Sequence, residues 1–483
     1  MRTVRARMAT ILTTVALTIS AGGCGDDDGG SGNTNDNQAN QNTNQNTNTN
    51  TNGVNPQLIP GGGVMSGPIA GTLHVYVVRA EDDAPISGAS VRVGEPESAS
   101  PLVTTTDQAG LATFVDASLT GPQTITATAS GRGAVTWLGV PGANATLPLV
   151  QVPAPTLQTA TVSGTVEGWM SYSSPGFGMY RAAIVNYSHT DNILGAENSI
   201  TQPVDGEGVG LNLCIFSPIV AEDDCNWSLV TRTGRQIIYA TIVNGDPNGT
   251  PSDITDDTMT VIGYAALTGL DLTAGQNLSG QTLLQMNDIT NVTVSFPAAP
   301  AGLEDLVAVP YIVMGVDGRV PAYIFTGSTP TAALPQLSGP FAGGVYDFIG
   351  IANTTGAVDT ETSLSFLRNV NIGGGVSLPA WLPIPTGVTA NAGTYSFGAV
   401  SAAQLHTITY VDAQGHGVWV VLPLDGRTSF TLPALAQDPL PSGQITMTVA
   451  AMAIPGFDPA NFNTPALADT VSQTSTAQTT FTH

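Results

Sequence analysis

The chain has 483 residues, and its 42% hydrophobic content is sufficient for packed cores and excludes a mainly disordered protein. All 12 basic residues are arginine, and the 36 acidic residues give a net charge of −24, a balance that repels nucleic acid and anionic lipid headgroups. Only 10% of the residues are charged, whereas 55 are glycine and 33 are proline, a composition that favours short strands and turns over helices.

The N-terminus has the layout of a secretory signal. An apolar run over 8–19 is shorter than the ~20 residues that a membrane-spanning helix needs. Three basic residues precede this run: Arg2, Arg5 and Arg7. We therefore predict that residues 1–23 are a signal peptide. Its removal leaves 483 − 23 = 460 residues, which is too long for one hydrophobic core and predicts about three or four domains.

Residues 21–24, Ala-Gly-Gly-Cys, resemble the lipobox of bacterial lipoproteins. Ala21 departs from the pattern, since that family usually has leucine there. The resemblance implies that Cys24 becomes the first residue of the mature chain and carries two or more acyl chains, which anchor stably in a membrane. Gly25 stands where an acidic residue signals inner-membrane retention in some bacteria, so the resemblance favours an outer membrane lipoprotein on the periplasmic or extracellular face. The alternative is an ordinary signal cleaved near Ala21, with Cys24 incidental.

The segment 24–63 is predicted to be a disordered tether that starts at the lipidated cysteine. Its low-complexity part, 25–60, consists largely of Asn-Thr and Asn-Gln pairs and has almost no apolar residue with which to bury a core. As a flexible chain it would have a root-mean-square span of roughly 30–35 Å. Asn/Gln-rich tracts also form aggregating β-structure, but a tether fits the position next to the anchor better.

The first folded unit is predicted over 64–155. Four strands are predicted between turn residues, at 74–78, 89–93, 111–114 and 124–129. The segments 111–114 and 124–129 alternate strictly with period 2, which is the signature of a strand. Between the second and third of these strands, Asp107 and Gly110 predict a tight turn. The aspartate can bond to the backbone of the turn, and the glycine supplies its conformation.

The order Pro-Ile-x-Gly-Ala-x-Val-x-Val, then Thr-Asp-x-x-Gly-x-x-x-Phe, then a Thr/Val strand and Ser-Gly resembles carboxypeptidase regulatory-like domains. Residues 85–93, 106–114 and 124–131 carry this resemblance. It implies a small transthyretin-like β-sandwich of the wider Ig-like sort. It also implies that the Asp-x-x-Gly turn is structural and that no catalytic residue carries over.

A second unit is predicted over 156–288. Its strand at 236–243 is apolar on both faces, which indicates a central position in its sheet. The unit holds the remaining cysteines, Cys214 and Cys225. In an oxidising compartment they predict a local disulfide. A zinc site would need further ligands that are not nearby, so metal binding and free thiols stay the alternatives.

Residues 289–384 and 385–483 are predicted to be two copies of one sandwich domain. Leu334-Pro335 matches Leu432-Pro433, and 432 − 334 = 98, while Ser295-Phe296 matches Ser396-Phe397, and 396 − 295 = 101. A period of about one hundred residues is the size of one such domain. The second copy faintly resembles a fibronectin type III domain. The alternative is one large sandwich with coincidental similarity.

The sequence offers no catalytic motif and only weak metal candidates. His-Glu-x-x-His, Gly-x-Ser-x-Gly and Walker segments are absent from it, so no catalytic residue and no cofactor is predicted. Asp253, Asp256 and Asp257 could form a calcium site, although they lack full EF-hand spacing and also suit a solvated turn. His406 and His416, on a predicted hairpin, are the nearest approach to a metal or acid–base pair.

Together these features predict an all-β protein with tandem β-sandwich domains, Ig-like or transthyretin-like, after a lipoprotein signal and a disordered Asn/Thr-rich linker. The predicted function is that of a surface-tethered, non-enzymatic lipoprotein that serves adhesion, scaffolding or ligand binding, with a protein or glycan partner. The aromatic loop 169–180 could be a binding tip, although packing beneath the loop is the simpler interpretation. Two alternatives stay open: a secreted hydrolase of carbohydrate or peptide on an unrecognised β scaffold, and a calcium-stiffened spacer.

Overall fold

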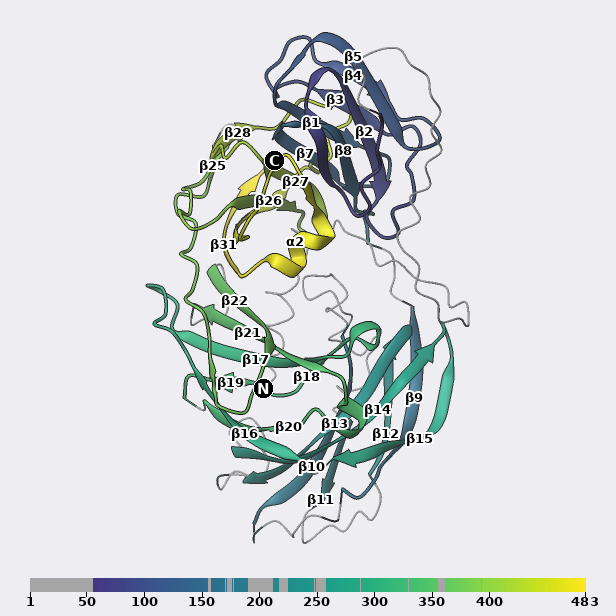
Figure 1. The fold of residues 1–483 in the computed structure, drawn as a ribbon, viewed down its shortest axis with the longest axis vertical. Coiled ribbons are helices and arrows are strands. Elements are labelled where there is room, and N and C mark those ends of the chain that lie inside the picture. Colours follow the sequence, from purple (N-terminus) through teal and green to yellow (C-terminus); the bar gives the residue numbers. More distant parts are fainter. Residues whose placement is uncertain are drawn as a thin grey trace.

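Strands dominate the protein (Figure 1). The computed structural model describes residues 55–154, 158–169, 171, 176, 178–189, 212–216 (backbone only), 225–246, 248, 258–286, 288–328, 330–354, 361–391 and 393–483. Within these ranges, α2 (Thr464–Thr470) is the one α-helix. The described part contains no helix with the length and apolar character needed to cross a membrane. The all-β class predicted from the sequence is confirmed.

The first unit is a sandwich of two sheets that enclose an apolar core. One sheet has the order β30 (Phe462–Asn463), β1 (Gly63–Pro68), β8 (Gly142–Leu149), β2 (Ala70–Arg79) and β5 (Leu111–Thr120). The facing layer has the order β7 (Ala134–Val140), β6 (Gln123–Thr128), β3 (Ser90–Val93) and β4 (Leu102–Thr105). In β5, Ala112 and Phe114 point into the core and Thr113 is exposed, so the period-2 pattern predicted over 111–114 is confirmed. Strands β2, β3, β5 and β6 correspond to the four predicted strands, except that residues 89 and 129 lie just outside β3 and β6.

The turn before β5 has the construction that the sequence predicts. The Oδ1 atom of Asp107 accepts hydrogen bonds from the backbone N–H groups of Ala109 and Leu111, at 2.8 and 3.0 Å. Gly110 has φ +72°, and a Cβ atom there would lie 2.7 Å from the carbonyl oxygen of Val77. Only glycine avoids this clash, so the Asp-x-x-Gly turn is structural.

The second unit is built on a seven-stranded sheet. Its order is β11 (Asn212–Phe216), β10 (Tyr180–Tyr187), β13 (Gly234–Asp246), β14 (Thr258–Leu272), β15 (Asn277–Met286), β9 (Thr159–Val166) and β12 (Asn226–Arg232). Strand β13 is buried on both faces, because Ile238 and Ala240 pack in one core and Ile237 and Tyr239 in another. The central position predicted for 236–243 is confirmed.

A single long sheet joins the first unit to the rest of the chain. Its order is β18 (Arg319–Pro321), β17 (Asp305–Val313), β21 (Val345–Asn353), β22 (Glu361–Val370), β31 (Gln473–Thr482), β29 (Gln444–Ala453), β26 (Leu405–Val411), β27 (Gly417–Pro423), β7, β6, β3 and β4. Strand β27 runs parallel to β7, and β22 runs antiparallel to β31. The sheet therefore crosses the predicted boundaries between 64–155, 289–384 and 385–483. Those boundaries stay a prediction.

The long sheet consists of two halves in which the strands have a corresponding order. In one half, β17 lies between β18 and β21. In the other, the C-terminal half, β26 lies between β27 and β29. The halves meet where β22 pairs with β31. Shorter strands complete this region: β16 (Ile289–Ser295), β19 (Phe325–Thr326), β20 (Thr331–Pro335), β23 (Val376–Ser377), β24 (Thr389–Asn391), β25 (Thr394–Ser396) and β28 (Ser429–Thr431).

Candidate functional site

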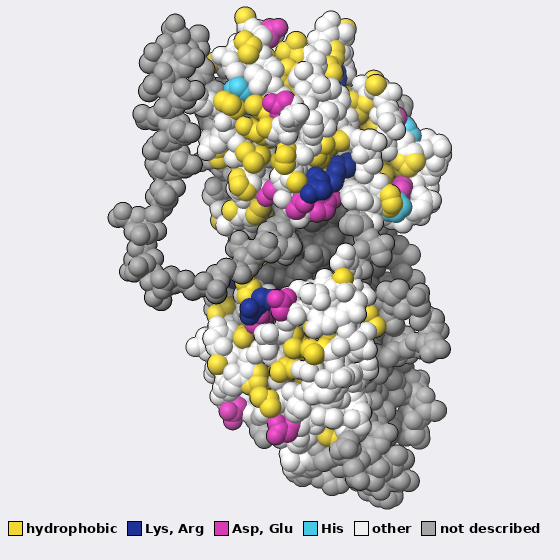
Figure 2. Space-filling model, turned by 90° about the vertical axis from the view of Figure 1, so that its right-hand side faces the viewer, with side chains coloured by type: hydrophobic (Ala, Val, Ile, Leu, Met, Phe, Trp, Pro, Cys, Tyr) yellow, Lys and Arg dark blue, Asp and Glu magenta, His cyan; other side chains and the backbone are white. Residues whose placement is uncertain are grey.

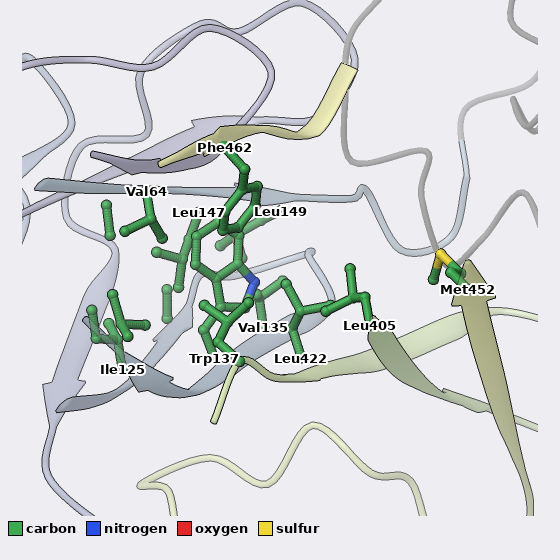
Figure 3. Close-up of a cluster of buried hydrophobic side chains, with 14 of the residues drawn as sticks. Val64, Ile125, Val135, Trp137, Leu147, Leu149, Leu405, Leu422, Met452 and Phe462 are labelled. Carbon is green, nitrogen blue, oxygen red and sulfur yellow. The ribbon is translucent and has the colours of Figure 1, made fainter. Parts of the chain in front are cut away.

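An apolar pocket lies where the first unit meets the C-terminal half of the long sheet. Figure 3 shows several of the side chains that line it. Its floor consists of alternate residues on neighbouring strands, which share one face of the sheet. Val135 lies opposite Val420, and Trp137 lies opposite Leu422. Leu405 of β26 continues this floor. The parallel β7–β27 pair therefore creates the site, because it places apolar side chains from two units side by side.

The roof of the pocket comes from the excursion between β29 and β31, which contains β30 and α2. Phe462 of β30 lies over the floor, with its ring centroid 5.7 Å from that of Trp137. Leu467 of α2 also lines the pocket, as do Pro148 and Val150 at the end of β8. The pocket is thus enclosed by segments that are more than 300 residues apart in sequence, since 462 − 148 = 314.

Both ends of α2 are fixed by side chains. At the N-terminus, Oδ1 of Asn463 accepts the N–H of Ala466 at 3.1 Å, and its Nδ2 donates to the carbonyl of Pro60 at 2.7 Å. At the C-terminus, the guanidinium of Arg368 donates to the carbonyls of Ala468 and Val471 at 2.8 and 2.6 Å. These bonds satisfy groups that a helix end leaves open. The roof is therefore held by two different parts of the chain.

The pocket contains one buried hydroxyl without a hydrogen bond. Thr407 lines the cavity and is 1% exposed, and its Oγ1 has no partner among the described residues. Thr464, which is half-buried, is the other polar lining residue. A buried polar group without a partner costs about 1–3 kcal/mol. The cavity measures about 50 Å³, and the described residues that line it include no charged side chain.

Several sites predicted from the sequence lie outside the described residues. They are Cys24 and the calcium candidates Asp253, Asp256 and Asp257. For Cys214 only the backbone is described, in β11 opposite Ala183. Cys225 is buried and directly precedes β12. The Cys214–Cys225 disulfide therefore stays a prediction.

His406 and His416 do not form a joint site. His406 lies near the start of β26, where its Nε2 accepts the N–H of Val400 at 3.3 Å. His416 lies beyond the other end of that strand, and its Nδ1 is 3.1 Å from Oδ2 of Asp412. The strand from His406 to its end covers 411 − 406 = 5 residues, roughly 16 Å. The predicted pairing across the hairpin is wrong, because the hairpin register places the two side chains at opposite ends.

A polar cluster lies at the other end of the long sheet. Arg319 of β18 forms a buried ion pair with Asp347 of β21, with 2.9 Å between Nη1 and Oδ2. The backbone N–H and carbonyl of His189 bond to those of Arg319. Burial, together with the smaller effect of the charge of Arg232, lowers the pKa of His189 to about 4. These contacts hold the second unit against β18, which is a structural role.

The described residues contain no group of three or more His, Cys, Asp or Glu side chains that could hold a metal ion. On the face shown in Figure 2, charged side chains are few, and basic ones lie beside acidic ones. Trp169, at the start of the aromatic loop, is 2% exposed and packs in the core with Trp227. For this residue the interpretation as aromatic packing is confirmed.

The pocket was not predicted from the sequence. Its main signal was present at 134–140, where Ala-Val-Thr-Trp-Leu-Gly-Val is apolar on both faces, a pattern typical of a strand covered on both sides. That pattern indicates that β7 has a second neighbour, but it does not identify β27. The roof residues Phe462 and Leu467 follow a loop that carries no motif.

Comparison with known proteins gives no family. No protein family and no curated protein matches the chain. Among solved structures, the Bacillus anthracis TIE protein is 11% identical over 64% of this chain and 50% of that chain, with a TM-score of 0.14. The chain thus spans about half of that protein's length.

Two further structures are similar to the chain at the same low level. Two B repeat units of the collagen binding protein of Staphylococcus aureus are 12% identical over 81% of this chain and 97% of that chain, with a TM-score of 0.15. A tetra-tandem repeat in the extending region of a large adhesion protein is 12% identical over 85% and 99%, with a TM-score of 0.13. TM-scores this low carry no argument about function.

Proposed function

We propose that the chain is a lipid-anchored, non-enzymatic protein of a bacterial outer membrane that presents a stiff array of β-sandwich units for adhesion or scaffolding. Cys24 would carry the acyl chains and the Asn/Thr-rich segment would be the tether. The partner would be a protein or a glycan. This proposal combines the lipobox resemblance with the continuity of the long sheet.

The continuity of the long sheet carries the scaffolding part of the proposal. Backbone ladders run without interruption from β18 to β4, so they link the first unit to both halves of the C-terminal region. Units joined only by linkers move freely relative to one another. Units that share a sheet can move only by breaking ladder hydrogen bonds, so the array presents its surfaces in a fixed arrangement.

The first described residues, which fall at the end of the predicted tether 24–63, are packed onto the first unit. Ile59 is 1% exposed, and its N–H donates to Oγ1 of Thr146 at 3.0 Å. Two residues earlier, the N–H of Gln57 donates to Oδ1 of Asn144 at 3.0 Å. Strand β1 then pairs with both β8 and β30. A force applied to the N-terminal segment would therefore act on the backbone hydrogen bonds of several strand pairs at once before it reached the core.

The anchor is tested by mass spectrometry of the mature N-terminus from bacterial membranes. The expected result is an acylated Cys24 and loss of membrane association in Cys24→Ser. An unmodified N-terminus at or near residue 21 would refute the lipid anchor. Protease treatment of intact cells then distinguishes the extracellular face, where the folded units are cut, from the periplasmic face.

Adhesion or scaffolding is tested by binding of the full chain to glycan arrays and immobilised extracellular proteins. Saturable binding without turnover of the bound partner is the expected result. Turnover on a panel of glycans and peptides, abolished by one acidic or histidine substitution, would replace the proposal by the hydrolase alternative.

The cysteine pair and the calcium candidates have separate tests. A peptide containing both Cys214 and Cys225 linked under non-reducing conditions is expected from mass mapping of the exported protein. Calcium bound through Asp253, Asp256 and Asp257 would raise the melting temperature of the full chain. An unchanged melting temperature at millimolar calcium removes that site.

A further inference from the structure

We infer that His406 is an acid-sensitive latch: its neutral ring holds the loop 397–404 against the long sheet, and protonation of the ring releases the loop. This device is independent of the lipid anchor and of the proposed adhesion. It rests on the hydrogen bond between Val400 and His406, on the position of His406 in a row of side chains across the sheet, and on the lack of acidic residues in the segments around it.

The hydrogen bond between the loop and the ring fixes the protonation state of the ring. Nε2 of His406 accepts the backbone N–H of Val400 at 3.3 Å, so this nitrogen carries no proton. In a protonated imidazole both nitrogens are donors, and the N–H group of Val400 would then face an N–H group of the ring. Protonation therefore replaces a hydrogen bond by a repulsive contact between two donors.

His406 belongs to a row of neighbouring side chains on one face of the long sheet. Its cross-strand neighbour on β29 is Ala451, and the row continues through Ser475 of β31 to Ser363 of β22. Adjacent residues of a strand point to opposite faces. Because Leu405 lines the pocket, the row lies on the face away from the pocket, where it crosses the meeting point of the two halves.

Each polar side chain of this row holds a segment that crosses over the sheet. Oγ of Ser363 donates to the carbonyl of Leu382 at 2.9 Å, and Oγ of Ser475 donates to the carbonyl of Pro383 at 2.6 Å. The imidazole of His406 holds the loop that follows this segment. Of these three side chains, only the imidazole changes its charge between about pH 8 and pH 5, so acid acts on the loop and leaves the two serine contacts in place.

Val400 shows what the latch covers. It is 5% exposed and packs with Leu382, Ala451 and Ala453 in a small apolar cluster. Further hydrogen bonds tie the loop to the rest of the chain near its ends, at Phe397, Gly398 and Gln404. Loss of the bond to His406 therefore frees the middle of the loop and uncovers this cluster.

The segments around His406 supply no acidic partner for a protonated ring. Strands β26, β29 and β31 and residues 378–404 contain no Asp, Glu, Lys or Arg. The loop also bonds to the segment 424–428, whose charged side chains, Asp425 and Arg427, pair with each other and with an acidic residue of the first unit. Burial lowers the pKa of His406, so the latch is closed at neutral pH and opens in acid.

The test is hydrogen–deuterium exchange of the full chain with Cys24→Ser, followed by mass spectrometry. Exchange is measured at about pH 7.5 and about pH 5 and corrected for the intrinsic pH dependence of amide exchange. Peptides that span 397–404 are expected to lose about tenfold in protection at the lower pH, because the open loop binds a proton more readily than the closed one. Peptides from β7 are expected to keep their protection.

Three variants separate the hydrogen bond from the charge. His406→Gln keeps an acceptor but cannot be protonated in this range, so protection of the loop should be high at both pH values. His406→Phe removes the acceptor, so protection should be low at both. His416→Gln changes a histidine at the other end of β26, which pairs with Asp412, and should keep the response of the parent chain.

The inference is overturned if protection of 397–404 is the same at both pH values, or if His406→Gln retains the response. Equal loss of protection in β7 would mean general unfolding in acid and would also overturn it. If His406→Phe disturbs folding, the comparison of His406→Gln with His416→Gln still decides the question. None of these outcomes depends on acylation of the N-terminus, so failure here is distinguishable from failure of the anchor.

Discussion

The two halves of the long sheet have the same strand neighbours but end in different ways. In the C-terminal half, the outer strand β27 pairs with β7 of the first unit, so the sheet continues beyond it. Trp419 on β27 is 2% exposed, and its Nε1 donates to Oγ1 of Thr136 at 3.0 Å. In the other half, the outer strand β18 has three residues, and Arg319 on it forms a buried ion pair with Asp347.

The difference shows how side chains decide whether a sheet edge stays an edge. An apolar edge strand with free backbone groups can pair with another strand. In this way β27 pairs with β7, and the layer of the first unit becomes part of the long sheet. A short edge with charged residues pointing inward stops the sheet. There the second unit pairs with β18 through the bridge between His189 and Arg319, and its side chains also share an apolar core with the sheet, in which Tyr264 packs near Val320. We expect mutations at the apolar junction to have larger effects than those at the polar one.

The largest effect is expected for Trp419→Ala at the β27–β7 junction. Loss of a large buried side chain from a packed core costs about 3–5 kcal/mol of unfolding free energy, and Thr136 also loses its hydrogen bond. Urea unfolding monitored by circular dichroism measures the change. Val316→Ala, at a side chain that is 73% exposed, serves as the control and should change stability by less than about 0.5 kcal/mol. A loss below about 1.5 kcal/mol at Trp419 would contradict the importance assigned to this junction.

The fold of single units was predictable from local sequence, and the junctions were not. The alternation over 111–114 and the Asp107–Gly110 turn were predictable, since each depends only on residues close in sequence. The pairing of β27 with β7 joins residues such as Val421 and Thr136. No local sequence pattern identifies which distant strand pairs with an apolar edge strand, because any apolar strand could pair with it.

The same reasoning explains the outcome at the candidate sites. His406 and His416 looked close on a hairpin diagram, but register and strand length separate them. The pocket contains no residue type that signals chemistry from sequence, since it is built from common apolar side chains and one threonine. It exists because segments around Trp137, Thr407 and Phe462 are brought together by pairing between distant strands.

The polar junction should respond to pH. Because burial lowers the pKa of His189 from 6.5 to about 4, the unfolded chain binds a proton more readily between these values. Stability is therefore complete above about pH 6.5 and falls as the pH drops towards 4, by at most about 3 kcal/mol. His189→Gln should remove this part of the pH dependence in urea unfolding.

His406 allows the pH effect to be assigned to the polar junction. Burial lowers the pKa of His406 as well, but this residue lies on β26 in the other half of the sheet. His406→Gln should remove only its own, smaller part of the pH dependence. If both variants change the profile equally, the polar junction has no special sensitivity to acid.

The meeting point of the two halves should be improved by one substitution. Thr474 of β31 is fully buried opposite Leu364 of β22, and its Oγ1 has no partner among the described residues. Thr474→Val replaces the hydroxyl by a methyl of similar size and should stabilise the protein by about 1 kcal/mol. Calorimetry measures the change. The neighbouring Ser475→Ala should act in the opposite direction, because Oγ of Ser475 donates to the carbonyl of Pro383 at 2.6 Å.

The smallest effect is expected at the solvent-exposed rim of the apolar junction. Arg427 connects the C-terminal half to the first unit through Glu95, at 2.7 Å, and its side chain also pairs with Asp425. The hydrogen bond from Arg427 lowers the pKa of Glu95, but the Glu95 side chain is 50% exposed. Exposed ion pairs contribute about 0–1 kcal/mol and weaken with salt. Arg427→Ala should therefore lower stability by less than about 1 kcal/mol at low salt, and the difference should shrink at 1 M salt, as measured by urea unfolding.

Arg79→Ala, which removes a pair with Asp82 inside the first unit, is the control for an ion pair that spans no junction. A large, salt-independent loss at Arg427 would mean that charge, and not the apolar strand pairing, holds the units together.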